Sequence, residues 1–220
     1  FYDYMLTPPA RAILERYGMT ETGMITSNPY RDGERLAGTV GVALPEIQVR
    51  IADDKGAVLP AGEVGVLEVK GPNVFKGYWN NPEKTAQEFR PDGYFITGDM
   101  SVLAPDGRVT IVGRATDLII SGGFNVYPKE IEDEINALPG VAESAVIGVP
   151  HPDLCEAVVA VVTPVKGTTL PAEAEIIAHL GGRLAKFKLP KRVFAVADLP
   201  RNAMGKVQKA ELRGTYGRTF

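Results

Sequence analysis

The hydrophobic pattern of this 220-residue chain changes character once, near residues 113–123, and this change constrains the fold more than any other feature. Before it, apolar and polar residues alternate with a period of two, as in Ile47–Ile51, Leu67–Val69 and Val109–Ile111. Such alternation predicts half-buried strands. Clusters of Asp, Pro and Gly, which favour turns, lie between them at 53–56, 60–62, 91–93 and 105–107. We therefore expect a small antiparallel sheet or a distorted β-barrel in the first half.

The second half mixes helical and strand periods. Residues Ser121–Phe124 read as a hairpin connection between two short apolar runs. Pro128 suits the first position of a helix that places Ile131, Ile135 and Leu138 on one face. Further strands are predicted at 145–149, 157–162 and 193–196, and a helix at 171–186 with an interruption near 181–182. The sequence thus predicts an α+β fold with two domains, residues 1–115 and residues 116–220.

Composition and termini exclude several classes of protein. The longest apolar run, 157–162, is far shorter than the ~18 residues that a membrane span needs. The N-terminal residues Phe1–Tyr4 lack the basic and apolar regions of a signal peptide and predict a cut end. Cys155 is the only cysteine, which excludes an internal disulfide, and with His151 and His179 it leaves a zinc site short of ligands. We expect a cytoplasmic protein without a membrane partner.

The net charge of −3 conceals a basic segment. From Arg183 to Arg213 there are nine Lys and Arg and two acidic residues, or +7, so the remainder carries −10. A basic segment on an acidic protein can attract the phosphates of a nucleotide, a coenzyme or a nucleic acid, although a solvated surface is the commoner explanation. Its aromatic residues are Phe187 and Phe194, and it matches no nucleic-acid-binding module, so we do not expect nucleic acid as a partner.

Two short motifs in the first half carry groups that could bind a nucleotide. Tyr17–Glu21 offers a ring, a glycine that permits close approach, a hydroxyl and a carboxylate suited to Mg²⁺. Asp99 follows an apolar run and Gly98, which predicts a carboxylate at a strand end, able to accept hydrogen bonds from two ribose hydroxyls. Taken singly, each motif is better explained as a structural turn.

The second half offers further candidates. Lys206 lies in a polar loop with Pro200 and Gly205 that could bring a mobile cation to a phosphate, although it does not match a P-loop. The alternative is that Lys206 is an ordinary surface lysine without a functional role. Cys155 with His151 could form a thiolate and its base, but no third group is available to orient the histidine.

The order of five motifs is more informative than any one of them. Along the chain come Tyr17–Glu21, Tyr94–Asp99, Gly113–Gly123, Asn125–Glu132 and Pro200–Lys206. This order resembles the acyl-adenylate-forming superfamily of acyl-CoA synthetases, luciferases and peptide-synthetase adenylation domains. The stretches 15–24, 26–30, 71–79 and 122–132 resemble its malonyl-CoA synthetases in particular. The resemblance runs from about Ile13 to Arg213, and residues 1–12 do not fit it.

The resemblance implies an enzyme that activates a carboxylate, here malonate, with ATP, releases pyrophosphate and then transfers the acyl group to CoA. It implies that Tyr17 packs against adenine, that Gly18 and Met19 belong to the same ATP/AMP site, that Asp99 and Arg114 hold the ribose, and that Thr20 binds a phosphate. Glu21 would hold Mg²⁺, and Lys206 would stabilise the transferring phosphate. The chain would be the C-terminal part of a longer enzyme, inactive alone because the family's Ser/Thr/Gly-rich phosphate loop is missing.

The resemblance also implies a motion. Residues 116–220 would form a mobile lid that rotates about Thr116 and Asp117, withdrawing Lys206 and bringing in Gly122 and Gly123 beside the pantetheine arm. CoA phosphates would then meet the basic residues Lys186, Lys188, Lys191 and Arg192. Relatives often carry Asp or Lys at the position of Thr116. The alternatives are a ligase for methylmalonate or another short-chain acid, and a non-catalytic module that binds nucleotide or CoA.

Overall fold

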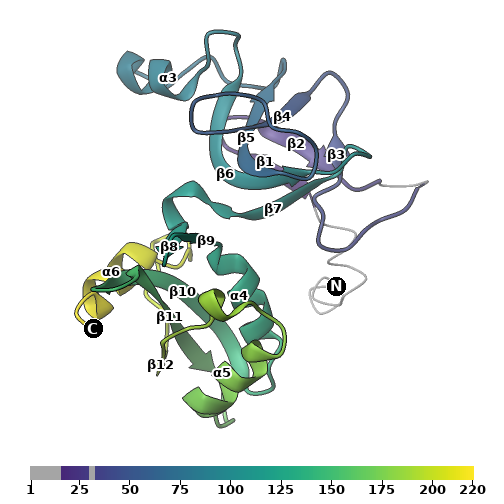
Figure 1. The fold of residues 1–220 in the computed structure, drawn as a ribbon. Coiled ribbons are helices and arrows are strands. Elements are labelled where there is room, and N and C mark those ends of the chain that lie inside the picture. Colours follow the sequence, from purple (N-terminus) through teal and green to yellow (C-terminus); the bar gives the residue numbers. More distant parts are fainter. Residues whose placement is uncertain (1–15, 30–32) are drawn as a thin grey trace. The chain divides into compact units, whose positions relative to one another are not determined.

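The computed structural model describes residues 16–29 and 33–220, so the expectation for residues 1–12 lies outside the described residues. The chain consists of two compact units, residues 1–115 and 116–220 (Figure 1). Each is built of strands and helices of its own. The fold is α+β, with antiparallel sheets in the first unit.

The first unit contains two antiparallel sheets. Three strands pair in the order β1-β2-β3, with bounds Arg16–Met19, Gly23–Ser27 and Val42–Ala43. Four strands pair in the order β4-β5-β6-β7, with bounds Gln48–Ala52, Val64–Lys70, Phe95–Leu103 and Val109–Arg114. Both sheets are open in the part of the chain that the structure describes. Of the two expected architectures, the antiparallel sheet is therefore the one observed, and there is no closed barrel among these residues. Their shared core is Ile25, Ile51, Leu67, Val69 and Val109.

A buried ion pair supports the second of these sheets. Glu68 on β5 is fully buried, and its carboxylate accepts hydrogen bonds at 2.7 Å from Arg50 Nε on β4 and from Arg90 Nε. The hydrophobic period alone does not predict an acidic residue at a core position. Two guanidinium groups offset the cost of removing this carboxylate from water.

The position of Asp99 differs from the prediction. It does not end a strand but lies inside the nine-residue strand β6. Glu68 pairs with Ile96 and Val66 with Met100, so β6 carries extra residues between the two pairs. Gly98 has φ of +74°, which accommodates the resulting bulge. The glycine that suggested a chain reversal therefore produces a bulge within a continuous strand.

One helix of the first unit, α3 (Pro82–Glu88), was not predicted. Asn81 Oδ1 accepts a hydrogen bond from Lys84 N at 3.1 Å, and Pro82 occupies the first helical turn. Both are typical of a helix N-terminus. The sequence signal was present in Asn81-Pro82-Glu83, but the helix buries no residue and so has no hydrophobic period.

The second unit is a sheet covered on both faces. Its order is β10-β11-β8-β9, with β12 pairing parallel to β11. The strands are β8 Ile119–Ser121, β9 Phe124–Val126, β10 Val141–His151, β11 Cys155–Pro164 and β12 Arg192–Ala195. The helices are α4 Pro128–Asn136, α5 Glu173–Gly181 and α6 Lys209–Tyr216, with short 3-10 turns η1 Ala115–Asp117 and η2 Lys186–Lys188.

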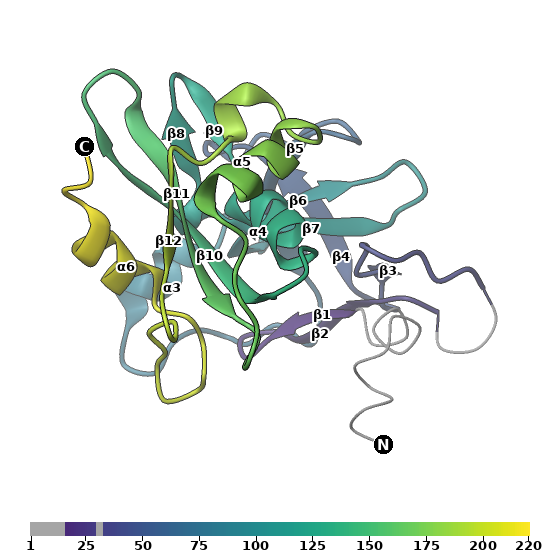
Figure 2. The same ribbon diagram turned by 90° about the horizontal axis from the view of Figure 1, so that it is seen from below.

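The two faces have separate hydrophobic cores. Helices α4 and α5 supply Ile131, Ile135, Ile176 and Leu180 to one core, and α6 supplies Leu212 to the other. Figure 2 shows α4 and α5 on the opposite side of the sheet from α6. Successive residues of β10 and β11 alternate between these cores, and this explains their continuous apolar runs.

Candidate nucleotide and phosphate sites

The Tyr17–Glu21 motif forms the end of β1 and the turn into β2. A Cβ atom on Gly18 would lie 2.3 Å from the carbonyl oxygen of Gly23, so only glycine fits opposite that strand. Thr22 N donates to Met19 O at 3.1 Å and closes the turn. Thr20 is exposed and Glu21 is half-buried. The turn thus presents a hydroxyl and a carboxylate on a fixed backbone.

Tyr17, Asp99 and Arg114 form one cluster in the first unit. The Tyr17 hydroxyl donates to Asp99 Oδ2 at 2.5 Å, and Arg114 Nε lies 3.2 Å from Asp99 Oδ1. Asp99 and Arg114 are direct partners across β6 and β7. Burial, followed by the hydrogen bond to Asp99 and the charge of that carboxylate, raises the pKa of Tyr17 well above its ordinary value. Tyr17 therefore remains a hydrogen-bond donor at physiological pH.

A second segment, residues 73–78, holds the turn that carries Thr20 and Glu21. Asn73 Nδ2 donates to the carbonyl oxygens of Thr22 at 2.6 Å and Met24 at 3.0 Å. Phe75 N donates to Glu21 O at 2.8 Å. Phe75 is itself packed in an aromatic cluster with Tyr78, Phe89 and Phe95. The stretch 71–79 thus fixes the backbone of the candidate metal-binding turn.

The side chain of Glu21 has its own partner in this segment. The Tyr78 hydroxyl lies 2.6 Å from Glu88 Oε2 and 3.3 Å from Glu21 Oε1, so its single proton faces two carboxylates. Burial and the neighbouring Glu88 raise the pKa of Tyr78. Among the described residues no group of three or more His, Cys, Asp or Glu side chains could hold a metal ion. A single carboxylate oxygen still suits Mg²⁺, which takes one or two protein carboxylates together with substrate phosphates.

Lys206 lies in the second unit, in the loop between β12 and α6. Asn202 Oδ1 accepts hydrogen bonds from Met204 N and Lys206 N, both at 3.0 Å, and Arg201 donates to Gly205 O at 2.8 Å. The Arg201 guanidinium also pairs with Glu143. Lys206 is exposed, and within the described ranges its ammonium group contacts no acidic side chain. The loop backbone is therefore ordered while the cation remains available.

The predicted hairpin is β8-β9, and a pocket lies beside its turn. Gly122 and Gly123 have φ of +57° and +83°, as a two-residue turn with both φ values positive requires. The pocket has a volume of about 230 Å³ and is lined by Ser121, Gly122, Phe124, Leu154, Phe187 and Lys191. The rings of Phe124 and Phe187 stack, with their centroids 4.5 Å apart. The glycines thus have a structural reason for their presence beyond any ligand.

The four basic residues predicted to meet CoA fall into two groups, those with an acidic partner and those without one among the described residues. Lys188 pairs with Glu130 at 2.6 Å and Arg192 with Glu173 at 3.2 Å, so acidic neighbours already neutralise both. Lys186 and Lys191 are exposed and have no ion pair within the described part of the chain. Lys191 is the member of the four that lines the pocket at the hairpin.

The expected hinge lies at the boundary of the units, which falls between Ala115 and Thr116. Thr116 is exposed. Asp117 is held by Arg213 of α6, whose Nη2 donates to Asp117 Oδ1 at 2.7 Å. Sequence reasoning did not find this partner, because nothing in the motif pairs two residues separated by 96 positions.

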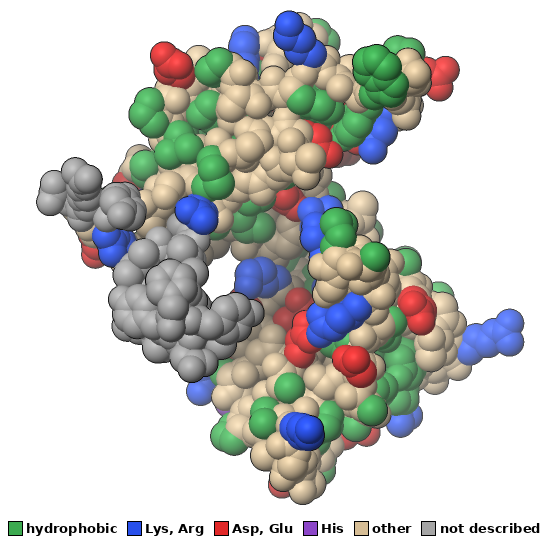
Figure 3. All heavy atoms as spheres, turned by 180° about the vertical axis from the view of Figure 1, so that it is seen from behind, with side chains coloured by type: hydrophobic (Ala, Val, Ile, Leu, Met, Phe, Trp, Pro, Cys, Tyr) green, Lys and Arg blue, Asp and Glu red, His purple; other side chains and the backbone are tan. Residues whose placement is uncertain are grey.

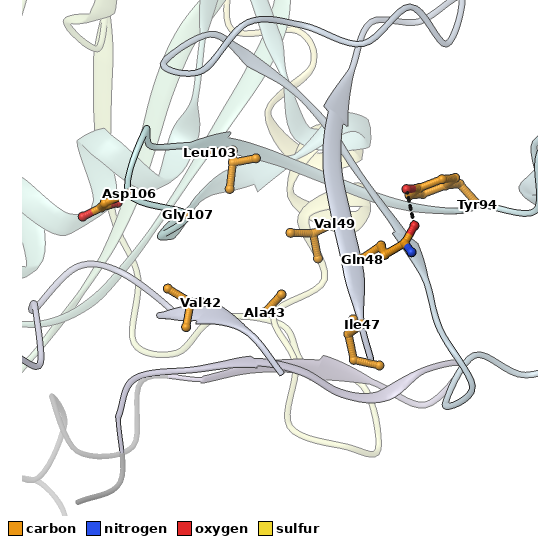
Figure 4. Close-up of a pocket in the computed structure, with 9 residues that line it drawn as sticks. All are labelled: Val42, Ala43, Ile47, Gln48, Val49, Tyr94, Leu103, Asp106 and Gly107. Atoms are coloured by element: carbon orange, nitrogen blue, oxygen red, sulfur yellow. Dashed lines mark hydrogen bonds between the residues drawn. The ribbon is translucent and has the colours of Figure 1, made fainter. Parts of the chain in front are cut away.

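Two features of the surface fall outside these sites. A groove of about 550 Å³ in the first unit is lined mainly by apolar side chains with Gln48, Tyr94 and Asp106, and contains none of the predicted site residues (Figure 4). On the face drawn in Figure 3, basic and acidic side chains are interspersed with apolar ones. No helix in the described ranges has the length and apolar character needed to cross a membrane.

Comparison with known proteins decides the family. The model of the AMP-binding enzyme family matches residues 3–79, and that of the AMP-binding enzyme C-terminal domain matches residues 130–206. The chain belongs to the AMP-binding enzyme family. Its two units therefore carry the two parts by which this family is recognised.

Solved and curated members are similar over most of the chain. The ATP-bound crystal structure of MatB from Rhodopseudomonas palustris superposes with a TM-score of 0.86 and is 61% identical, covering 93% of this chain and 40% of that one. A feruloyl-CoA synthase of Amycolatopsis is 42% identical over 94% of the chain and 42% of its own length. A malonate–CoA ligase of Arabidopsis thaliana is 43% identical over 91% of the chain and 34% of its own length. The chain thus spans between about a third and two fifths of the length of these family members.

Proposed function

We propose that this chain is the C-terminal part of an ATP-dependent acid–CoA ligase that works through an acyl-adenylate. The observation that carries the proposal is the cluster of Tyr17, Asp99 and Arg114, three positions far apart in sequence that meet at one carboxylate. An aromatic ring beside an oriented carboxylate and a cation is suited to a nucleoside. The adjoining Thr20–Glu21 turn offers groups for its phosphates.

In the first step a carboxylate oxygen of the acid attacks the α-phosphorus of ATP, and the bond to the pyrophosphate oxygen breaks. Negative charge is crowded at the phosphate as this happens, so positive charge placed there lowers the barrier. Lys206 supplies an ammonium group, and Thr20 supplies a hydroxyl to a phosphate oxygen. Glu21 would hold Mg²⁺, which when bound supplies further positive charge to the phosphates.

In the second step the sulfur of CoA attacks the acyl carbon of the adenylate and AMP leaves. We propose that residues 116–220 turn about Thr116 and Asp117 between the steps, so that Lys206 withdraws and the turn at Gly122 and Gly123 approaches the pantetheine arm. Lys186 and Lys191, which have no ion pair among the described residues, are the best suited of the basic residues to receive CoA phosphates.

For the acid we propose malonate. The stretches 15–24 and 26–30 support this choice, as does the similarity to malonate–CoA ligases of Arabidopsis thaliana and of human mitochondria, the latter 39% identical. Feruloyl-CoA synthase is equally similar, so an aromatic acid is the competing candidate. The two acids differ in charge, and malonate calls for a second cationic group in the pocket.

The test is pyrophosphate release by the full-length protein that carries this chain, with ATP, Mg²⁺ and malonate, methylmalonate, acetate or ferulate. We expect malonate to give the highest kcat/KM. Preference for ferulate or acetate would exclude malonate as the substrate while leaving the ligase proposal intact. Absence of pyrophosphate release with every acid, at a nucleotide concentration that protects the protein from thermal unfolding, would contradict the ligase proposal itself.

A further inference from the structure

The Asp99 carboxylate is held at both of its oxygens. Tyr17 donates to Oδ2 at 2.5 Å and Arg114 Nε lies 3.2 Å from Oδ1. A carboxylate has about four acceptor positions, two on each oxygen. Tyr17 takes one position on Oδ2, and Arg114 forms an ion pair at Oδ1, so at least one acceptor position remains on each oxygen. A vicinal diol presents two donors. The occupied positions therefore leave a set of acceptors that matches the two hydroxyls of a ribose.

The two protein partners of Asp99 are not equivalent. Arg114 has a side chain that is 60% exposed, whereas the Asp99 side chain is only 8% exposed. Tyr17 is half-buried, and its hydroxyl approaches Asp99 more closely than Arg114 does. A solvated guanidinium restrains a neighbour weakly, since water competes for both groups. The orientation of the carboxylate therefore depends mainly on Tyr17.

Thr97, the other hydroxyl nearby, cannot take over this role. Its Oγ1 donates its only proton to Leu67 O at 2.8 Å and accepts a hydrogen bond from Asp99 N at 3.1 Å. It therefore holds the backbone of the bulge in β6. Within the described residues, Tyr17 is the side-chain hydrogen-bond donor to the Asp99 carboxylate, and Arg114 forms an ion pair with it.

We propose that the Tyr17 hydroxyl is a positioning group that orients Asp99 toward the ribose diol and so determines the preference of the enzyme for ribonucleotides. The inference rests on the proposed function, because it assumes that Asp99 binds the ribose of ATP. It assigns Tyr17 a second role, separate from contact between its ring and adenine. The hydroxyl acts on the sugar through Asp99, and the ring acts on the base.

The test uses Tyr17→Phe in the full-length protein, because phenylalanine keeps the ring and removes only the hydroxyl. The measurement is kcat/KM for pyrophosphate release with ATP, 2′-deoxy-ATP and 3′-deoxy-ATP at a saturating acid concentration. We expect the wild type to prefer ATP, and Tyr17→Phe to reduce this preference about tenfold, as loss of one hydrogen bond to a charged group allows. Asp99→Asn should reduce it as well.

Tyr94→Phe is the matched control. The Tyr94 hydroxyl donates to Gln48 Oε1 at 2.9 Å in the same unit and does not contact Asp99, so its removal should leave the preference unchanged. The preference is the ratio of the kcat/KM values for two nucleotides measured on the same variant. It therefore remains measurable if a fraction of the molecules fails to fold. An unchanged ratio in Tyr17→Phe would overturn the inference and leave the ligase proposal standing. A wild type that releases pyrophosphate equally well from all three nucleotides would overturn the inference and the ribose role of Asp99 together.

Discussion

At the scale of single residues, the candidate residues of the first unit are held by neighbouring side chains, whereas the ammonium group of Lys206 in the second unit has no acidic partner among the described residues. Tyr17 and Asp99 are held by short contacts inside the first unit. Lys206 differs because its loop is ordered through Asn202 while its side chain is exposed. A long, solvated ammonium group on an ordered loop can move to a phosphate without unfolding its surroundings. This contrast predicts that Lys206 contributes to chemistry and little to stability.

Lys206→Ala in the full-length protein should slow adenylation about 10²- to 10³-fold, equivalent to ~3 to 4 kcal/mol of transition-state stabilisation. It should still convert supplied malonyl-AMP and CoA to the thioester, since the lysine is proposed to have withdrawn by that step. The two half-reactions are measured separately, with Lys166→Ala, another exposed lysine of the second unit, as the control. Equal loss of both half-reactions in Lys206→Ala would contradict the proposed rotation.

At the scale of elements, strands β4 and β5 are joined through a charged residue in the core. Glu68 is fully buried between Arg50 and Arg90. Arg50 also pairs with Asp92 at 2.6 Å, but the Asp92 side chain is 53% exposed. The same guanidinium thus makes one buried and one solvated ion pair. Burial decides their energies, because only the buried partners lose hydration that must be replaced.

Glu68→Gln should lower the free energy of unfolding by about 3–5 kcal/mol, the range found when one partner of a buried ion pair is removed. The loss arises because two guanidinium groups then face an uncharged amide. Asp92→Asn removes the solvated partner of the same Arg50 and should have little effect. Urea unfolding of this chain, followed by circular dichroism, compares the two. Similar midpoints for Glu68→Gln and the unchanged chain would show that the buried pair does not stabilise the sheet.

Element prediction from sequence succeeded where the signal is local. The strands at β4, β5 and β7 and the hairpin at 121–124 follow from alternation and turn glycines, and the helix from Pro128 follows from a proline at its first position and an apolar face. Helices α3 and α6 were not predicted: α3 buries no side chain and α6 buries only Leu212. The bulge at Asp99 was missed because a glycine with positive φ serves a turn and a bulge equally well.

At the scale of the whole molecule, the second unit has a core of its own on each face of its sheet. Its described ion pairs, such as those of Asp117 with Arg213 and Glu130 with Lys188, join residues within the unit. A unit with internal cores and internal charge pairs does not depend on its neighbour for burial. This independence is also what a domain that rotates during the reaction requires.

Residues 116–220 expressed alone should therefore fold and unfold cooperatively, with retained strand and helix signals in far-ultraviolet circular dichroism. The replacement Ile135→Ala, in the core beneath α4, should destabilise this unit by about 2–5 kcal/mol through loss of burial and the cavity it leaves. Glu134→Gln, which is also on α4 but alters a partly exposed ion pair with Arg183, is the control. A broad, non-cooperative melting curve for the isolated unit would show that it needs the rest of the chain.

The sequence by itself determined the α+β class, the order of the motifs and the resemblance that they carry, because alternation, turn chemistry and motif spacing are all properties of neighbouring residues. Only the tertiary structure decided that Tyr17 donates to Asp99 across 82 positions, that Arg213 holds Asp117, and that β12 joins the sheet in parallel beside β11. These contacts depend on strand order, bulges and the packing of distant segments. Their stability is shared between residues far apart in the chain, so no local pattern records them.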